Sequence, residues 1–386
     1  MDMQQKKLSQ QIIGWRRALH RIPEVGFDLV QTTAYVEAEL AKLGILAERV
    51  AGGAGLTADI EGNAPGKTAA LRADMDALPI REETGLPFAS ENGNMHACGH
   101  DGHIAMLLGA AALLAGNRNF PGKVRLLFQP AEENLGGAKN MVADGVLRGV
   151  DAVFGMHAGL LTDAAPGTFS FKSGVLTASF DRFDITIRGA GSHGARPEDG
   201  VDPIVVSASV ISALQTLASR EHRATDPYVF SIGSIHGGET YNIIPDEVTL
   251  KGCMRACCEE TRERLKARVT EIVGGVCAAM RAKGTVTFYP GYLSAVNDAK
   301  CTKLAHDKAA ELFGEDSTEW MEQPIMVSED VSEYLARVPG CFWLYATPGA
   351  CCLHHSSTFD IDETLLWRGS VLMDASARAF LAGSGD

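Results

Sequence analysis

The sequence "HACGHDGHIAMLLGAAALLA", residues 96–115, places metal-binding types of side chain directly before a long apolar run. Its first eight residues contain three histidines, one cysteine, one aspartate and two glycines. The apolar run from Ile104 to Ala115 predicts a buried helix, and Gly116 is a typical residue at a helix end. The polar cluster before it could bind a metal ion, present a reactive thiol or form a polar turn, so the rest of the chain must decide among these.

Buried strands alternate with predicted helices on both sides of this stretch. Strands are predicted from Lys67 to Ala73 and within residues 123–133, 151–159 and 341–347, where apolar residues run together, and the strand within 151–159 is expected to end at His157. Helices between such strands predict an α/β fold with a largely parallel sheet. Because 386 residues exceed what one hydrophobic core usually supports, we expect more than one domain.

The pattern changes between residues 178 and 290, where apolar and polar residues alternate as in half-exposed strands. The predicted order is strand, helix, strand, strand, helix, strand, which is typical of a ferredoxin-like α+β module with one open sheet face. We therefore predict that this module is inserted into a larger α/β domain. The predicted elements lie at 178–189, 202–221, 228–238, 247–255, 259–280 and 285–290, and the predicted domain segments are 1–177, 178–290 and 291–386.

Charge and composition exclude several classes of protein. With a net charge of −13, the chain has no basic field to attract a phosphate backbone, so we expect neither nucleic acid nor an anionic membrane as a partner. No segment reaches the roughly 18 apolar residues of a membrane helix. The first 20 residues lack a secretory apolar core and predict an amphipathic helix instead, one face of which carries Leu8, Ile12, Trp15 and Leu19. Nine cysteines without a small-scaffold spacing fit reduced thiols, so we expect a cytoplasmic protein.

Candidate ligands follow the predicted strands at the edge where the carboxyl ends of parallel strands meet. Thiolate, imidazole and carboxylate together suit zinc, manganese, cobalt or nickel better than calcium or magnesium. About five such ligands are too many for one catalytic ion with an open position, so they favour two divalent ions that share a bridge. The candidates are Asp74, Asp76, Cys98, His100, Glu132, Glu133, His157, His354 and His355.

Other residues near these ligands suggest supporting roles. In the adjacent pair 132–133, one glutamate can bind a metal while the other takes a proton from water. Asp74 and Asp101 could accept hydrogen bonds from the ring N–H groups of ligand histidines. Three alternatives remain open at this point: Cys98 as a structural thiol or a covalent nucleophile, the glutamates as a solvated helix start, and His103 as an outer or capping residue.

Nine short motifs, taken in order, resemble the metal-dependent aminoacylase/carboxypeptidase family. The branch they resemble is that of the N-acyl-amino-acid amidohydrolases, which includes hippurate hydrolases and auxin-conjugate hydrolases. Each motif is moderately specific by itself, whereas the ordered set, which runs from residue 15 to residue 380, is highly specific. The motifs are "RIPEVGF", "LRADMDALPI", "HACGHDGH", "FQPAEE", "GMHA", "GAGSHGARPEDGVDP", "YNIIPDEVTLKGCMR", "SEDVSEYL" and "HHSSTFDIDE".

The resemblance implies a two-metal, aminopeptidase-like catalytic domain with a mixed sheet. The inserted module would then be a lid or dimerisation domain of a homodimer or homotetramer. By the same resemblance, Glu132 is the general base. The last ligand is His355, five residues before Asp360, with His354 as the alternative because the doubled histidine leaves the register open. The full implied ligand set is Cys98 as the bridge, His100, Glu133, His157 and His355.

The resemblance also assigns residues of the inserted module. His193 matches a histidine that reaches the substrate carbonyl, in some relatives across a dimer, where an imidazole can stabilise an oxyanion. Asn242 and Arg255 match substrate-holding positions, although a turn residue and a strand-end ion pair are their alternatives. The sequence departs from motifs that the family often has at Pro197-Glu198 and at His355-Ser356-Ser357. These departures affect the expected substrate choice more than metal binding, because the ligand set is complete.

We therefore expect hydrolysis of the amide bond of an N-acyl amino acid or a related amide. A dipeptidase or carboxypeptidase that uses the same site is the alternative within the family. A non-catalytic metal-binding protein is a rival of another class, and Glu132 argues against it because a binding module has no need of a general base. A thiol enzyme that uses Cys98 is a further rival, which alkylation would block and chelators would not.

Overall fold

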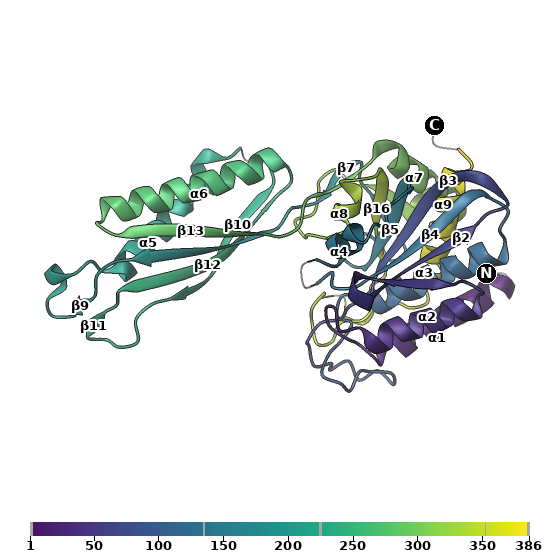
Figure 1. Ribbon diagram of the computed structural model, residues 1–386, viewed down its shortest axis with the longest axis horizontal. Coiled ribbons are helices and arrows are strands. Elements are labelled where there is room, and N and C mark those ends of the chain that lie inside the picture. The colour runs from purple at the N-terminus through teal and green to yellow at the C-terminus, as the bar shows by residue number, and fades with distance from the viewer. Residues whose placement is uncertain (1–2, 134–135, 224–225, 352, 384–386) are drawn as a thin grey trace. The chain divides into compact units, whose positions relative to one another are not determined.

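The computed structural model describes residues 3–133, 136–223, 226–351 and 353–383. The chain forms two compact units (Figure 1). The smaller unit includes the segment Pro324–Glu329, because the Ala178 N–H donates to the carbonyl oxygens of Ile325 and Val327, at 3.2 and 3.0 Å. The sequence pattern had assigned this segment to the larger domain. The larger unit comprises Met1–Leu176, Ala295–Gln323 and Asp330–Asp386, and the smaller unit comprises Thr177–Ser294 and Pro324–Glu329.

The larger unit is an α/β structure. Its helices are α1 (Met3–His20), α2 (Val30–Lys42), α3 (His100–Gly116), α4 (Gly137–Ala143), α7 (Ala299–Phe313), α8 (Ser332–Leu335) and α9 (Leu366–Leu381), with short turns η1 (Ala51–Gly53) and η4 (Glu315–Ser317). Its strands are β1 (Ala47–Val50), β2 (Gly55–Glu61), β3 (Ala64–Asp74), β4 (Pro121–Gln129), β5 (Ala152–Gly159), β6 (Phe169–Phe171), β7 (Gly174–Thr177), β14 (Ala295–Asn297), β15 (Thr318–Trp320) and β16 (Gly340–Ala346).

The main sheet of the larger unit is mixed, with the order β1-β2-β4-β3-β5-β16-β6-β15. The predicted parallel arrangement is confirmed for the central strands, since β4, β3, β5 and β16 run parallel to one another. Toward the edges, β1, β2 and β6 make antiparallel pairs. The carboxyl ends of the four central strands therefore meet at one edge, where ligands usually bind in open α/β sheets.

Helices α1, α3 and α9 pack on one another beside this sheet (Figure 1). The predicted N-terminal helix is confirmed, because Leu8, Ile12, Trp15 and Leu19 are all buried. Helix α3 is apolar on every side, as expected for a helix enclosed by other elements. A side chain at Gly109 would meet both neighbouring helices, because a Cβ there would lie 2.3 Å from Ser370 Oγ and 2.8 Å from Ile12 Cδ1.

Two predicted element ends were wrong, and both shifts affect the candidate ligands. Helix α3 begins at His100 rather than Ile104, because Gly99 takes a left-handed φ of 87° that turns the chain into the helix. Strand β5 continues past His157 to Gly159, because β16 pairs with it up to Ala346. His100 therefore lies in the first helical turn, and His157 lies inside a buried strand.

The smaller unit has the predicted order of strands and helices. Its sheet has the order β10-β12-β8-β13 with antiparallel neighbours, as predicted. Burial alternates along β8, and α5 and α6 pack on the buried face (Figure 1). The elements are β8 (Asp181–Arg188), β9 (Ser192–His193), η2 (Pro197–Asp199), α5 (Pro203–Leu214), η3 (Leu217–Glu221), β10 (Tyr228–His236), β11 (Ile243–Ile244), β12 (Glu247–Ala256), α6 (Glu259–Ala279) and β13 (Lys283–Pro290). None of the helices in the described part of the chain is both long and apolar enough to cross a membrane.

The packing of α3 generates a stability prediction. Gly109→Ala should lower the free energy of unfolding by about 1–3 kcal/mol, because the new methyl group overpacks the junction with α1 and α9. The matched control is Gly14→Ala on the exposed side of α1, where a Cβ meets nothing within 4 Å. This control should raise stability by up to about 1 kcal/mol through helix propensity. Urea denaturation of both variants measures the difference, and equal effects would contradict the packing argument.

Candidate metal centre

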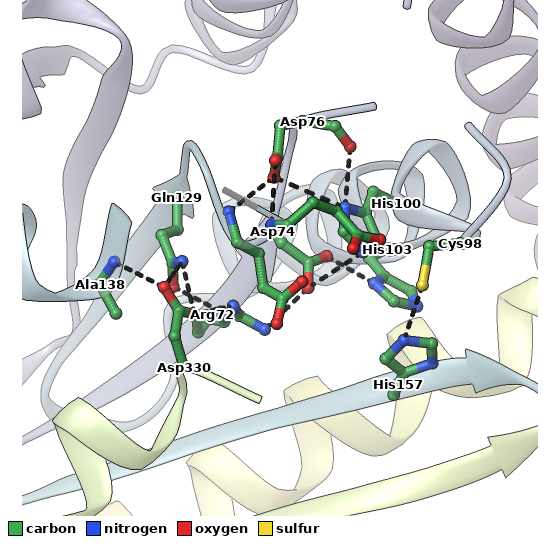
Figure 2. Close-up of polar contacts among 12 residues, drawn as sticks. Arg72, Asp74, Asp76, Cys98, His100, His103, Gln129, Ala138, His157 and Asp330 are labelled. Atoms are coloured by element: carbon green, nitrogen blue, oxygen red, sulfur yellow. Dashed lines mark hydrogen bonds and ion pairs between the residues drawn. The ribbon is translucent and has the colours of Figure 1, made fainter. Parts of the chain in front are cut away.

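The candidate ligands of the larger unit gather where β3, β4 and β5 end and α3 begins (Figure 2). Cys98 and His100 flank Gly99 at the start of α3, and Figure 2 shows the Cys98 thiol facing His157 of β5. The Cys98 Sγ lies 3.4 Å from His157 Nε2. The ligand atoms of Cys98, His100 and His157 all lie within 4.8 Å of one another.

Both histidines of this group present their Nε2 atoms because their Nδ1 atoms are engaged by backbone carbonyl groups. His100 Nδ1 lies 2.8 Å from the carbonyl oxygen of Asp76, and His157 Nδ1 lies 3.0 Å from that of Ala158. A carbonyl oxygen accepts, so each ring donates from Nδ1 and turns its Nε2 toward the other candidate ligands. Among the described residues, the buried His100 Nε2 has no hydrogen-bond partner.

A second group shares the same thiol. The ligand atoms of Cys98, Glu133 and His355 also lie within 4.8 Å of one another. His355 Nε2 lies 3.2 Å from the buried Glu133 Oε1. The two groups of three donor atoms overlap at one sulfur, while the bridging role of Cys98 stays a prediction.

The geometry distinguishes between the two adjacent histidines near the C-terminus. His355 faces Glu133, and its backbone N–H donates to the carbonyl oxygen of Ala97 at 2.8 Å. His354 Nδ1 lies 3.7 Å from the Cys98 thiol, while His354 Nε2 accepts from the Leu160 N–H at 3.3 Å. Burial lowers the pKa of His354 to about 4. The His355 ring therefore lies with the donor atoms of Cys98 and Glu133, and His354 is a neutral ring beside them.

Asp76 positions three of the functional groups, a role that the sequence analysis did not assign. Its Oδ1 accepts from the Glu132 N–H at 2.8 Å, and its Oδ2 accepts from the Glu133 N–H at 3.1 Å. Its backbone carbonyl holds His100, as described above. The only sequence signal was the paired aspartates of "RADMD" directly after a predicted strand.

Glu132 lies on a turn that Asp76 fixes. Glu132 is buried, and its carboxylate lies within 4.8 Å of donor atoms of His100 and Glu133. The preceding Ala131 has a φ of 53°, in the left-handed region that a residue with a side chain rarely adopts. The two hydrogen bonds to Asp76 compensate for this strained backbone and present both carboxylates to the same space.

Asp74 belongs to a buried network behind the ligands (Figure 2). It accepts from His103 Nδ1 at 2.5 Å and from the Arg72 guanidinium at 2.9 Å. His103 Nε2 accepts from the Ala158 N–H at 2.7 Å, so both nitrogens of this ring are used. Asp74 thus accepts from a ring N–H as predicted, but the ring is that of His103, and His100 Nε2 lies 3.7 Å away. His103 orients the site and offers no free nitrogen to an ion.

Arg72 links this network to the next strand. It donates to Gln129 Oε1 at 2.8 Å and to Asp330 Oδ1 at 3.0 Å. Asp330 also accepts from the Gln129 amide and from the Ala138 N–H. Arg72, Asp74 and Gln129 are all fully buried, so charge and polar groups here are matched within the protein interior.

Asp101 does not have the partner that the sequence analysis expected. Its Oδ2 accepts from Arg16 Nε at 3.0 Å and from His20 Nδ1 at 2.7 Å, and neither residue is a candidate ligand. Burial by itself lowers the pKa of His20. The carboxylates of Asp101 and Glu82 outweigh burial and raise this pKa to about 9. The prediction was wrong because the first turn of α3 directs Asp101 away from the ligands and toward α1.

Electrostatics at the site follow from burial and from neighbouring charges. Burial, together with the Glu133 and Glu132 carboxylates, raises the pKa of the Cys98 thiol well above its usual value. Burial lowers the pKa of His157 well below its usual value. Burial opposes the charge on His100 too, yet Asp74 and Asp76 raise its pKa to about 10. The site thus carries excess carboxylate charge, which favours a cation.

The donor set fits divalent transition metals. Two imidazole Nε2 atoms, a shared thiol, a carboxylate and a third imidazole converge, and His100 Nε2 is buried without a hydrogen-bond partner among the described residues. Imidazole and thiolate donors suit zinc, manganese, cobalt and nickel, and the carboxylate adds negative charge. A cation would satisfy His100 Nε2 and Glu133 Oε1 together.

The predicted residues of the smaller unit fall into two places. His193 in β9 pairs with Ile243 in β11, and the Gly194 N–H donates to the carbonyl of Asn242 at 2.8 Å, so His193 and Asn242 are neighbours (Figure 1). Arg255 lies near the other end of β12. It comes eight residues after Glu247, the first residue of β12, which corresponds to about 26 Å at 3.3 Å per residue. Its NH1 donates to the Met326 carbonyl and to Ser328 Oγ, both at 2.9 Å.

Residues 70–377 match the sequence family described as peptidase family M20/M25/M40. The chain belongs to this family. The match includes all the candidate ligands, and it spans the insertion that forms the smaller unit.

Two curated relatives and a solved structure match over nearly the whole chain. N-acetyl-L-cysteine deacetylase from Bacillus subtilis is 42% identical over 97% of this chain and 89% of its own length. Thermostable carboxypeptidase 1 from Saccharolobus solfataricus is 38% identical over 95% of this chain and 94% of its own. The crystal structure of YXEP from Bacillus subtilis, described as a dinuclear metal-binding peptidase of the M20 family, has a TM-score of 0.86 and 36% identity, with 97% and 99% of the two chains covered. The predicted family and fold class are therefore confirmed.

The role of Asp76 generates a prediction about metal binding. Asp76→Ala removes both acceptors of the 132–133 turn, so both carboxylates lose their fixed position. Metal affinity should fall by about 10–100-fold, as it does when residues that orient metal ligands are removed elsewhere. Competition with a chromogenic chelator measures this, and Asp59→Ala at a partly exposed ion pair is the control. Unchanged affinity in Asp76→Ala would contradict the positioning role.

Proposed function

We propose that this protein is a metal-dependent amidohydrolase that cleaves the amide bond of N-acyl amino acids. The observation that carries the proposal is the pair of donor groups that share Cys98 beside the buried carboxylate of Glu132. The relative named N-acetyl-L-cysteine deacetylase supports an N-acyl amino acid as the substrate class. Free dipeptides are the alternative substrates, which the relative named thermostable carboxypeptidase 1 supports.

In this proposal Cys98, His100 and His157 hold one ion, and Cys98, Glu133 and His355 hold the other. Manganese, zinc, cobalt and nickel are the candidate metals, because the donors combine nitrogen, sulfur and oxygen. Two such ions would supply Lewis-acid polarisation of the amide carbonyl and activation of water. The arrangement disfavours a thiol enzyme, because burial and the neighbouring Glu133 and Glu132 carboxylates raise the pKa of the Cys98 thiol.

Glu132 performs the proton transfers. Its carboxylate takes one proton from the attacking water and delivers it to the nitrogen that leaves as an amine, so amide and water give a carboxylate and an amine. Burial and the hydrogen bonds from the turn to Asp76 hold the carboxylate in one orientation. A residue that must accept and return a proton in sequence needs such a fixed position.

His193, Asn242 and Arg255 are proposed to bind the substrate. An imidazole at His193 can donate to the developing oxyanion, and the guanidinium of Arg255 can pair with a substrate carboxylate. Arg255 NH1 is already used by Met326 and Ser328, so the carboxylate would pair with its Nε and NH2 atoms. The distance between Arg255 and the His193–Asn242 pair within the smaller unit disfavours one substrate contact made by all three in a single subunit.

This distance supports the proposal of a homodimer or homotetramer in which the smaller unit is a lid or dimerisation domain. The smaller unit joins the rest of the chain at the Asp181 and Pro290 ends of β8 and β13. His193 follows the opposite end of β8, about 23 Å away along seven residues. We therefore propose that His193 of one subunit serves the metal centre of another.

A reducing, cytoplasmic location is also proposed. All eight cysteines among the described residues are free, including Cys341 and Cys277 in the interior. Free thiols persist in reducing compartments.

Substrate assays test the proposed function. The metal-free protein should be inactive, and added manganese, zinc, cobalt or nickel should restore hydrolysis of N-acetyl and N-benzoyl amino acids. Faster cleavage of free dipeptides would favour the peptidase alternative. Glu132→Gln should lower turnover by about 10²–10⁴-fold while the metals stay bound, because it removes the proton acceptor and keeps the shape.

The fully metal-loaded wild-type protein must itself be active in these assays. If it cleaves neither acyl amino acids nor dipeptides, the proposed function is wrong. If Glu132→Gln retains near wild-type turnover with both ions bound, the role of Glu132 is wrong even though the enzyme activity stands.

Mixing two inactive variants tests whether His193 acts across subunits. His193→Ala and Glu132→Gln each disable a different component of the site. In a mixed dimer, one of the two sites regains both an intact Glu132 and a partner's His193, so random mixing should restore about a quarter of wild-type turnover. If His193 acts within its own subunit, the mixture should stay as inactive as its components. Turnover after unfolding and refolding the variants together is the measurement.

A further inference from the structure

We propose that Arg16 is a positioning residue for the half of the metal centre that contains His355. This inference rests on the proposed metal-dependent function. Arg16 touches no candidate ligand, and it lies on the first helix, far from the ligand motifs in the sequence. The structure connects Arg16 to the candidate ligands through carboxylates.

Arg16 is a buried cation that ties three segments together. Its side chain is 2% exposed, on the apolar face of α1. It donates to Asp101 at 3.0 Å, to Asp360 at 2.7 Å and to Glu363 at 3.3 Å. Asp101 follows His100 at the start of α3. Asp360 lies near the end of the His355 loop, which we define as residues 353–361, and Glu363 follows this loop.

The His355 loop lies against the start of α3, and its outer end depends on Arg16. Gly102 makes room for the loop, because a Cβ there would lie 2.5 Å from Ile361 Cδ1. The His355 N–H holds the tip of the loop to Ala97. The guanidinium of Arg16 supplies the buried ionic contact at the Asp360 end.

His355 is the candidate ligand with the least local support. Its side chain is 52% exposed, and its φ of 64° lies in the left-handed region. His100 and His157 lie on a helix and a buried strand, and the Asp76 carboxylate holds the turn of Glu133. Metal sites need their ligands within roughly 0.5 Å of the productive geometry, so a shift of the loop acts on His355 first.

The cluster around Arg16 contains a suitable control. His20 is buried in the same cluster and contacts Asp101 at 2.7 Å and Glu82 at 3.1 Å. These contacts involve neither Asp360 nor Glu363. Loss of His20 therefore perturbs the same buried charges while the Arg16 contacts with Asp360 and Glu363 remain. Arg17, which is largely exposed and pairs with Glu363, controls for surface charge on the same helix.

Titration of the metal-free full-length protein with Co²⁺, followed by absorbance and calorimetry, tests the proposal without any substrate. His355→Ala and His157→Ala first identify which binding step belongs to which half of the centre. Arg16→Gln and Asp360→Asn should weaken the His355 step at least about tenfold and leave the His157 step within about threefold. His20→Gln and Arg17→Gln should change neither step beyond that limit.

The titrations separate the proposal from a general structural role. If Arg16→Gln and Asp360→Asn leave the His355 step unchanged, or weaken both steps equally, Arg16 does not position that half of the centre. Should Arg16→Gln fail to fold, Asp360→Asn decides alone, because its side chain is partly exposed. Wild-type protein that binds two ions but hydrolyses nothing would overturn the proposed function and leave this inference standing.

Discussion

The hydrogen bonds of Asp76 are the constraint on which the candidate metal centre depends. One residue at the end of β3 holds the Glu132–Glu133 turn with its carboxylate and orients His100 with its carbonyl group. The proposed general base, one proposed ligand of each ion and the start of α3 are therefore all positioned by a single residue just after β3. A site built on strand ends in this way needs little reorganisation when it binds an ion.

Behind this point, buried charges lie next to charges of opposite sign. Arg72 forms ion pairs with Asp74 and Asp330, and Arg16 and His20 both contact Asp101. Removing one partner of such a pair typically costs about 3–5 kcal/mol, because the other charge stays buried without compensation. The two clusters flank the candidate ligands, so the interior that supports the site is polar and closely matched, whereas the rest of the larger unit is packed with apolar side chains.

Most of the fold could be predicted because its signals are local. The amphipathic face of α1, the apolar run of α3 and the strand-helix order of the smaller unit all appear as periodic patterns within single elements. The errors occurred at element ends. The start of α3 at His100 and the extension of β5 past His157 depend on a glycine turn and on pairing with β16, which neighbouring residues do not reveal.

The sequence by itself determined the donor chemistry, the order of the elements and the family resemblance, since residue types and their spacing are written in the chain. Only the tertiary structure decided that His355 rather than His354 faces Glu133, that Asp76 clamps the glutamate turn, and that Asp101 faces Arg16 instead of a ligand. The physical reason is that these pairings join residues far apart in the chain, up to 347 positions for Arg16 and Glu363. Such contacts follow from how helices and strands pack, and packing depends on the whole core at once.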